Sequence, residues 1–140
     1  LKDLGLADTA HRCLFMQQDA CNMKSRFTGY DMVVASNLIE RAYEPAKFLN
    51  SIHERINENG LLMIVSDYSW KEEYTEKENW LGGYKDAQSG ENVTSLEGLH
   101  NLLDEHFECI SDDISIPSIL RVTGRNFTIN DSQVTVWKKK

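Results

Sequence analysis

At 140 residues the chain has the length of one domain, and its 41% share of hydrophobic residues is enough for a core that buries most of the apolar surface. Fifteen Lys and Arg against 22 Asp and Glu give a formal charge of −7, and the only basic cluster is Lys138, Lys139 and Lys140, which argues against a nucleic-acid partner. No apolar run is long enough to cross a bilayer, and no signal-peptide pattern opens the chain. Three cysteines without CxxC spacing argue against a disulfide framework. We therefore expect a cytoplasmic protein without a membrane partner.

Two short apolar runs predict buried strands in the first quarter of the chain. Residues 12–18 (RCLFMQQ) lead to Asp19, and residues 31–35 (DMVVA) follow the turn-like sequence TGY. Both runs are apolar and bounded by turn residues, as strands inside a sheet are.

A helix and a third strand follow. The pair Glu44-Pro45 is typical of a helix start, and Asn59-Gly60 is typical of a left-handed cap at a helix end. The residues predicted for the apolar face of this helix are Phe48, Leu49, Ile52 and Ile56. The helix leads directly into the apolar strand 61–65 (LLMIV), and this order is typical of a parallel sheet with crossover helices.

A second helix and a pair of strands complete the chain. Thr94 and Glu97 fit a capping box. The apolar residues at helical spacing are Leu96, Leu99, Leu102, Leu103 and Phe107. The segments FECISDDISI and FTINDSQVTVW then predict an antiparallel pair, joined by a loop that contains Arg121 and Arg125. Because no repeat or linker divides the chain, we expect residues 1–140 to form a single domain.

Polar residues follow the first two predicted strands. Asp19 lies in QQDACNM and Asn37 in ASNLIER. At the carboxyl edge of a parallel sheet, a carboxylate can accept hydrogen bonds from the amino group of a ligand. For Asp19 the alternative is an acid in a surface turn or helix cap, and the same alternative holds for Asn37.

Aromatic residues follow the strand 61–65. Five of the eight Tyr and Trp residues of the chain lie within seventeen positions: Tyr68, Trp70, Tyr74, Trp80 and Tyr84. Aromatic rings with polar tips suit a pocket for a flat, partly charged ligand. A lid that packs its rings onto the sheet is an equally good interpretation.

Two kinds of site are disfavoured by spacing. The four histidines and three cysteines have no ligand-like arrangement, so we predict no metal site, and no nucleophile-base set can be argued from residue order. None of the eight glycines forms a GxG after a strand, so a nucleotide-binding loop would have to lie outside this chain.

The order of these motifs resembles the second half of a class I S-adenosylmethionine-dependent methyltransferase, through DACNM, YDMVVASNLIER and EPAKFLNSIHERINENGLLMIVS. More specifically, DYSWKEEYTEKENWLGGY and the ending RVTGRNFTINDSQVTVWKKK resemble the C-terminal methyltransferase domain of ovothiol synthases, the 4-mercaptohistidine N1-methyltransferase family. The likeness runs from about residue 12 to residue 138. Where the family usually reads RETARK, this chain reads RVTGRN, with Val122 and Asn126 in place of glutamate and lysine.

The resemblance implies an α/β fold: the second half of a Rossmann-like class I sheet, mostly parallel, with an antiparallel strand pair at its C-terminal end. It implies S-adenosylmethionine as cofactor, with Asp19 and Ala20 at the adenine and Asn37 at the methionine part. It further implies methylation of the imidazole of 5-mercaptohistidine. The residues expected at this substrate are Tyr68, Trp70, Asn79 and Trp80, with Arg121 or Arg125 at its carboxylate.

The same resemblance places two strands between the first two strands of this chain, so we expect a partial domain that lacks the glycine-rich cofactor loop. A preceding segment or a homo-oligomer would complete the site, and the isolated 140 residues are expected to be inactive. Two alternatives remain open, namely a non-catalytic α/β interaction module and a methyltransferase for another small molecule.

Overall fold

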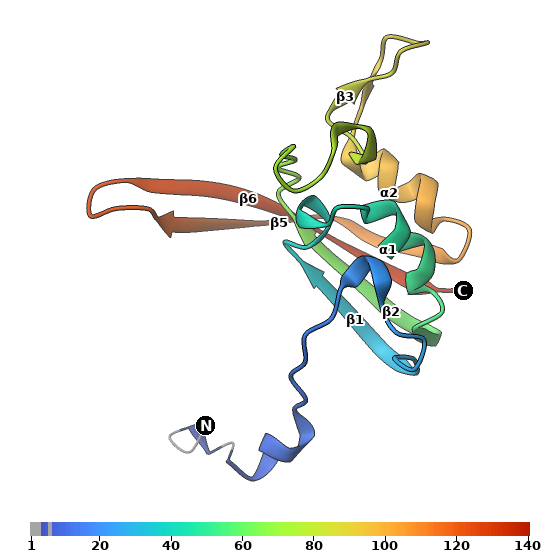
Figure 1. Ribbon diagram of the computed structural model, residues 1–140, viewed down its shortest axis with the longest axis vertical. Coiled ribbons are helices and arrows are strands. Elements are labelled where there is room, and N and C mark those ends of the chain that lie inside the picture. Colours follow the sequence, from blue (N-terminus) through green and yellow to red (C-terminus); the bar gives the residue numbers. More distant parts are fainter. Residues whose placement is uncertain (1–3, 6) are drawn as a thin grey trace.

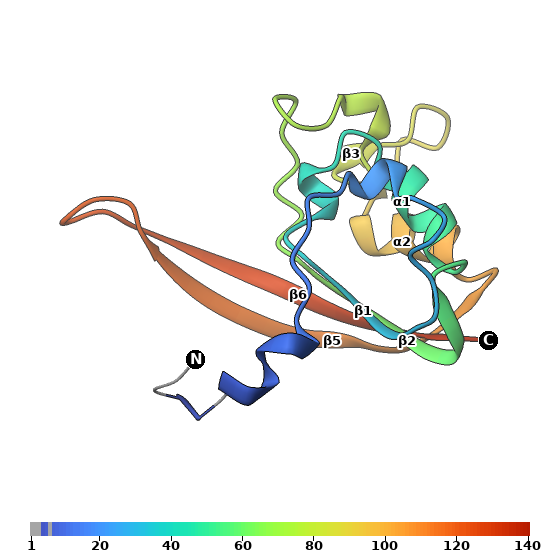
Figure 2. The ribbon, with the colours of Figure 1, turned by 60° about the horizontal axis from the view of Figure 1, so that its bottom comes forward.

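A computed structural model describes residues 4–5 and 7–140 of the protein. It shows a four-stranded mixed sheet with both α-helices on one face (Figures 1 and 2). The sheet has the order β1-β2-β6-β5. Its strands are β1 (Tyr30–Ser36), β2 (Ile56–Ser66), β5 (Phe107–Arg121) and β6 (Phe127–Lys139). The α-helices are α1 (Pro45–Ile52) and α2 (Ser95–Leu103). The 3-10 helices are η2 (Ala7–Arg12), η3 (Ala20–Asn22), η4 (Ile39–Arg41) and η5 (Lys77–Asn79), and β3 (Tyr84–Lys85) pairs with β4 (Asn92–Val93) in a small separate ribbon.

The strand pairing confirms the predicted crossover and the predicted terminal strand pair. β1 and β2 are parallel, with Ala35 opposite Ile64, and α1 connects them. β6 runs antiparallel to both of its neighbours, β2 and β5. The parallel pair fixes the carboxyl edge of the sheet, because β1 and β2 both end there.

The core lies between the helices and one face of the sheet. The residues that form it include Phe48, Leu49 and Ile52 of α1, Leu99 and Leu103 of α2, and Leu62, Ile64 and Trp137 of the sheet. All of them are almost fully buried, and full burial of a Leu, Ile or Phe side chain is worth about 1.5–3 kcal/mol. The predicted helical apolar faces are therefore correct over α1 and α2, and they hold both helices against the sheet.

Both helices end earlier than predicted, because the next strand begins sooner. α1 ends at Ile52, and Ile56 already belongs to β2, while Phe107 opens β5 instead of extending α2. Asn59 does adopt a left-handed backbone with φ 63°, but it does so in the irregular start of β2 rather than in a helix cap. Gly60 is required there, since a Cβ would lie 2.9 Å from the carbonyl oxygen of Asp31.

The strand predicted for residues 12–18 is wrong. Arg12 ends the 3-10 helix η2, and the residues after it form an irregular, extended segment that leads from the outlying η2 to η3 beside α1 (Figure 1). Leu14 and Phe15 are 79% and 92% exposed. No strand within residues 4–5 and 7–140 pairs with this segment, and an apolar run without a hydrogen-bonding neighbour cannot become a strand.

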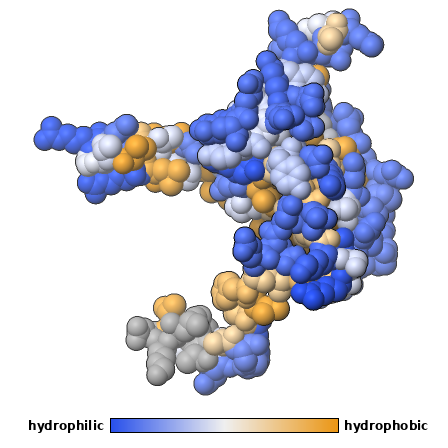
Figure 3. All heavy atoms as spheres, in the orientation of Figure 1, coloured by the Kyte–Doolittle hydropathy of each residue, from blue (hydrophilic) through white to orange (hydrophobic). Residues whose placement is uncertain are grey.

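The ends of β5 and β6 form a hairpin arm, residues 116–132, that projects beyond the carboxyl edge (Figures 1 and 3). Gln133 of β6 pairs with Ser66, the last residue of β2, so the arm extends about 20 Å further at about 3.4 Å per residue. Ile119 and Ile129 pair across it and are 68% and 73% exposed. Within the part of the chain that the structure describes, no helix has both the length and the apolar character needed to cross a membrane.

Candidate functional site

The aromatic segment, residues 67–84, lies at the carboxyl edge of the sheet, as the sequence predicts for a binding loop. It begins where β2 ends, and the backbone N–H of Tyr68 donates to Ser66 Oγ over 3.0 Å. Further along, Asn79 Nδ2 donates to the carbonyl of Tyr43, which follows β1, over 3.2 Å. The segment therefore spans the ends of both parallel strands.

Tyr68 is held in a left-handed backbone conformation, with φ 51°. Its hydroxyl donates to Gln133 Oε1 over 2.9 Å. Burial, followed by the negative charges of Glu40 and Cys109, raises the pKa of Tyr68 to about 12. The phenol is therefore a neutral hydrogen-bonding group at neutral pH.

The two tryptophans of the segment stack on each other, with ring centroids 6.5 Å apart and planes 22° apart. Trp70 Nε1 donates to Ser95 Oγ over 2.9 Å, and Trp80 Nε1 donates to the carbonyl of Thr75 over 2.9 Å. These internal bonds fit the lid interpretation, since they use the polar tips. Both rings are only partly buried, and Trp70 also lines a cavity, which fits the pocket interpretation as well.

Two cavities are lined by predicted substrate residues of the aromatic segment. Tyr68 and Trp70 line a cavity of about 540 Å³ together with Tyr84, Ser95 and other residues of β3, β4 and the start of α2. Asn79 lines a second cavity of about 410 Å³, whose other walls are Tyr43, Glu44, Glu72, Glu73, Tyr74 and Glu76. Trp80 directly follows Asn79 and stacks on Trp70, and so connects the two groups.

The predicted cofactor residues lie at the same edge. Asp19 caps η3, with Oδ1 accepting from the N–H of Cys21 over 2.9 Å, so the helix-cap interpretation describes its present role. Its Oδ2 accepts from the hydroxyl of Tyr43 over 2.9 Å, and this bond is the main reason that the pKa of Tyr43 rises to about 12. Ala20 opens η3, and Asn37, with φ 48°, donates from its N–H to the carbonyl of Val65 over 2.8 Å.

The predicted arginines lie elsewhere. Arg121 and Arg125 are at the tip of the arm, where Arg121 Nε donates to the carbonyl of Thr123 over 3.1 Å. In the described part of the chain, no hydrogen bond joins either arginine to the aromatic segment. The structure thus does not bring the arginines of one chain together with Tyr68 and Trp70.

One buried acid at this edge was missed by the sequence analysis. Glu40 of η4 is 1% exposed, and Ser66 Oγ donates to its Oε2 over 2.8 Å. Because the same Oγ accepts from the N–H of Tyr68, a continuous path of hydrogen bonds runs from Glu40 through Ser66 to the aromatic segment. The signal available in the sequence was an acid within the apolar run NLIE, just after the predicted strand 31–35.

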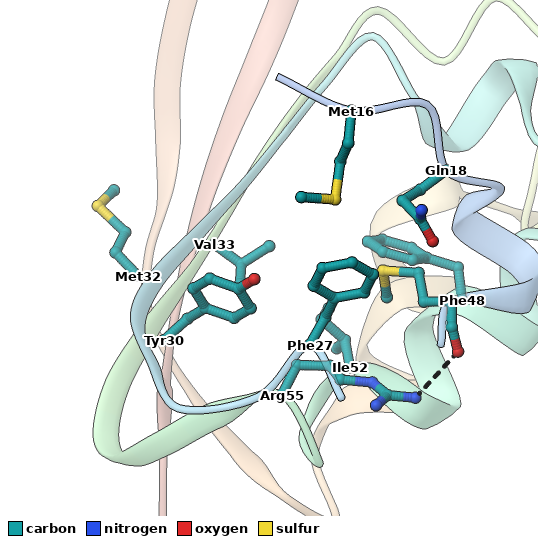
Figure 4. A pocket seen from close by; sticks show the side chains of 10 residues that line it. Met16, Gln18, Phe27, Tyr30, Met32, Val33, Phe48, Ile52 and Arg55 are labelled. Carbon is teal, nitrogen blue, oxygen red and sulfur yellow. Dashed lines mark hydrogen bonds between the residues drawn. The ribbon is translucent and has the colours of Figure 1, made fainter. Parts of the chain in front are cut away.

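An apolar cavity of about 310 Å³ lies beside β1, the edge strand of the sheet (Figure 4). Met16, Phe27 and Val33 point into it from three segments, and Phe48 and Ile52 contribute from α1. The outer side of β1 has no neighbouring strand among the residues described. This edge can therefore accept a further strand, with apolar side chains filling the cavity.

Comparisons with known proteins identify the fold. No protein-family model matches the chain, and no curated protein matches it. One similar solved structure comes from work on the conversion of a disulfide bond into a thioacetal group during echinomycin biosynthesis. It has a TM-score of 0.54 at 14% identity, over 88% of this chain and 54% of its own. The chain thus spans about half the length of that neighbour.

A second similar structure is a SAM-dependent methyltransferase from Methanosarcina mazei, with a TM-score of 0.54 at 16% identity, over 99% of this chain and 77% of its own. The strand order, the parallel β1–β2 pair and the antiparallel end of the sheet agree with this likeness. The chain therefore has the α/β fold of the class I S-adenosylmethionine-dependent methyltransferases.

Proposed function

We propose that the chain is part of an S-adenosylmethionine-dependent N-methyltransferase domain that acts on the imidazole of 5-mercaptohistidine and so produces ovothiol A. The observation that carries the proposal is the cavity lined by Tyr68 and Trp70 at the carboxyl edge of β2. The fold supports methyl transfer, and the sequence of the aromatic segment supports this acceptor. A cytoplasmic location is part of the same proposal.

The cavity suits a small heteroaromatic acceptor. The Trp70 ring offers a flat apolar surface to an imidazole, and Tyr68 offers a neutral phenol. When bound, S-adenosylmethionine supplies an activated methyl group. The residues of this chain then have to hold the neutral ring in line with that methyl group and exclude water, which a stacked, hydrogen-bonded loop can do.

The residues present fit one part of the cofactor. Asp19 is exposed at the carboxyl edge and its carboxylate has acceptor positions beyond its two observed bonds, so Asp19 and Ala20 would hold the adenine, with Asn37 at the methionine part. The sequence contains no glycine-rich loop after a strand, so we assign that loop to residues outside this chain. The open edge of β1 and its apolar cavity support this assignment.

This division of the cofactor site predicts negligible S-adenosylmethionine binding by the isolated chain as a monomer. Isothermal titration calorimetry measures it directly. Micromolar affinity in a monomeric sample would contradict the assignment of the glycine loop to another segment.

We propose that Arg121 or Arg125 binds the carboxylate of the amino-acid substrate, and that the arm of a second copy delivers it. The arm tip lies about 20 Å past the end of β2, which supports delivery in trans over delivery within one chain. Alanine at either arginine is expected to weaken substrate binding, whereas Arg26→Ala, at an exposed position away from the arm, serves as the control. Unchanged affinity in both arm variants removes the arginines from the site.

A calorimetric titration with 5-mercaptohistidine tests the proposed function. Wild-type chain is expected to bind it more tightly than histidine, and Trp70→Ala is expected to weaken binding, with Tyr30→Phe as a control outside the cavity. Equal affinity of wild type and Trp70→Ala contradicts the proposal. Tighter binding of another compound in a panel of small nucleophiles favours a methyltransferase for a different substrate.

The exposed apolar arm favours a second candidate function, a non-catalytic interaction module. Ile119 and Ile129 present an apolar pair to solvent, and a two-stranded ribbon is marginally stable without a partner surface. If the module interpretation holds, Ile119→Asp abolishes association in analytical ultracentrifugation while Trp70→Ala leaves that association unchanged. Loss of 5-mercaptohistidine binding in Trp70→Ala separates the enzyme from the module.

A further inference from the structure

β5 is irregular where it passes beside α2. Cys109 lies opposite Trp137, but the pairing then shifts twice, first before Ser111, which pairs with Val136, and again before Ile114. Asp112 falls within the second shift and leaves the regular ladder. Bulges of this kind redirect side chains, and they are common beside functional sites.

His100 of α2 is oriented from two sides. Its ring lies edge-on to Trp137, with centroids 4.8 Å apart and planes 65° apart. Its Nδ1 lies 3.0 and 3.1 Å from the two carboxylate oxygens of Asp104, one helical turn further along. A carboxylate on one imidazole nitrogen fixes the tautomer, so that the proton is on Nδ1 and Nε2 carries a free lone pair.

We propose that His100, Cys109 and Asp112 bind a zinc ion. One ligand atom from each of the three residues lies within 4.8 Å of the other two. An imidazole nitrogen, a sulfur and a carboxylate oxygen are the ligands that zinc takes, and a water molecule completes the tetrahedron. The Asp104 carboxylate behind His100 is the outer partner that metal-bound histidines ordinarily have.

The geometry requires only a small adjustment. Zinc bonds of about 2.0–2.3 Å place tetrahedral ligand atoms about 3.3–3.8 Å apart, so the widest separation has to close by about 1 Å. Rotation of the Asp112 and Cys109 side chains can supply this movement. On binding, the Cys109 thiol releases its proton to solvent, and the sulfur–zinc bond then joins β5 to α2.

The sequence analysis predicted no metal site because His100, Cys109 and Asp112 have no recognisable ligand spacing. They meet only because α2 packs against the sheet beside Trp137 and because β5 is bulged. The proposed site uses none of the residues assigned to the cofactor or the substrate. It therefore does not depend on the proposed function.

Titration of the full chain with Zn²⁺ alone and with Co²⁺ alone tests the proposal. We expect saturable binding of one Zn²⁺ per chain in calorimetry, and with Co²⁺ a near-ultraviolet sulfur-to-metal charge-transfer band. Cys109→Ser abolishes the band, whereas Cys13→Ser retains it as the matched control. Asp104→Asn, which removes the charge behind His100, weakens Zn²⁺ binding by about 10- to 100-fold.

Folding is checked separately by circular dichroism of the metal-free variants, and Zn²⁺ is expected to raise the melting temperature of wild type but not of Cys109→Ser. Absence of saturable Zn²⁺ uptake by wild type overturns the proposal. So does a charge-transfer band that persists in folded Cys109→Ser.

Discussion

Ser66→Ala removes the hydroxyl that connects the buried carboxylate of Glu40 to the aromatic segment. Ser66 is fully buried, its Oγ donates to Glu40 Oε2 over 2.8 Å, and it accepts from the N–H of Tyr68 over 3.0 Å. The substitution deletes one oxygen atom and leaves almost no cavity. Its effect is therefore that of the lost hydrogen bonds.

A hydrogen bond to a charged group contributes about 1.5–3 kcal/mol, and the unpaired Tyr68 N–H adds to the loss, so we expect destabilisation of about 2–3 kcal/mol. At this chain length that corresponds to a melting temperature lower by about 6–9 °C. Urea unfolding followed by circular dichroism measures the free energy of unfolding. The matched control is Ser69→Ala, since Ser69 bonds to Asp67 through its backbone N–H.

A double substitution tests the physical cause. Adding Glu40→Gln to Ser66→Ala should recover part of the lost stability, because a neutral amide costs less than a carboxylate when it is buried without its partner. If Ser66→Ala lies within about 0.5 kcal/mol of wild type, as ordinary surface substitutions do, the path through Glu40, Ser66 and Tyr68 does not hold the segment.

Three further predictions concern single side chains. The pKa of Tyr68 is raised to about 12 in the folded state, so the stability that the neutral phenol contributes is present below pH 10 and is lost as the pH rises toward about 12. In alkaline unfolding curves, Tyr68→Phe should therefore lose less stability than wild type over this interval. Thr94→Ala removes the observed capping box of α2 and should lower the free energy of unfolding by about 1 kcal/mol, whereas Thr94→Ser should retain most of it. Gly98→Ala should destabilise the chain by more than about 2 kcal/mol in thermal unfolding, because the new Cβ would lie 1.9 Å from the carbonyl oxygen of Leu81. This loss outweighs the better helix propensity of alanine. A stable Gly98→Ala variant would show that α2 packs differently.

Periodic apolar patterns predicted much of the fold correctly. The strand at 31–35, the strand at 61–65 and the capping box at Thr94 appear where the sequence places them. These features are local, since each depends on residues a few positions apart. The antiparallel strand pair was also predicted, but its projecting arm was not. The alternation of apolar and polar residues indicates a strand, but it does not indicate how far that strand extends beyond its neighbours in the sheet.

The failures all depend on contacts between distant residues. Residues 12–18 have strand-like composition but no partner in the described sheet, so the strand predicted from composition alone does not form. Ile56 fits the apolar face of α1 by spacing, but the chain turns after Ile52, and Ile56 pairs with Tyr30 of β1 as the first residue of β2. The approach of His100 to Cys109 likewise arises only when α2 packs on β5 and β6.

The position of the aromatic segment was predicted correctly, whereas its role as a binding site stays a prediction. The aromatic segment lies at the carboxyl edge because β2 ends there, which follows from strand direction alone. Which of its rings face a cavity could not be predicted, since the partner of Trp70 is Ser95, twenty-five residues away. The arginines were assigned to the site by residue type, and only the strand register shows how far they project.

The three tryptophans of the chain allow the most direct test of the central claim, that the Tyr68–Trp70 cavity binds the imidazole acceptor. Trp70 and Trp80 belong to the aromatic segment, whereas Trp137 is fully buried under α2 and donates from Nε1 to Thr135 over 2.8 Å. In a two-dimensional ¹⁵N–¹H NMR titration with 5-mercaptohistidine, the indole signals of Trp70 and Trp80 should shift in a saturable manner while that of Trp137 stays in place. Saturable binding that leaves the Trp70 and Trp80 signals unmoved, or no binding at all, would contradict the account.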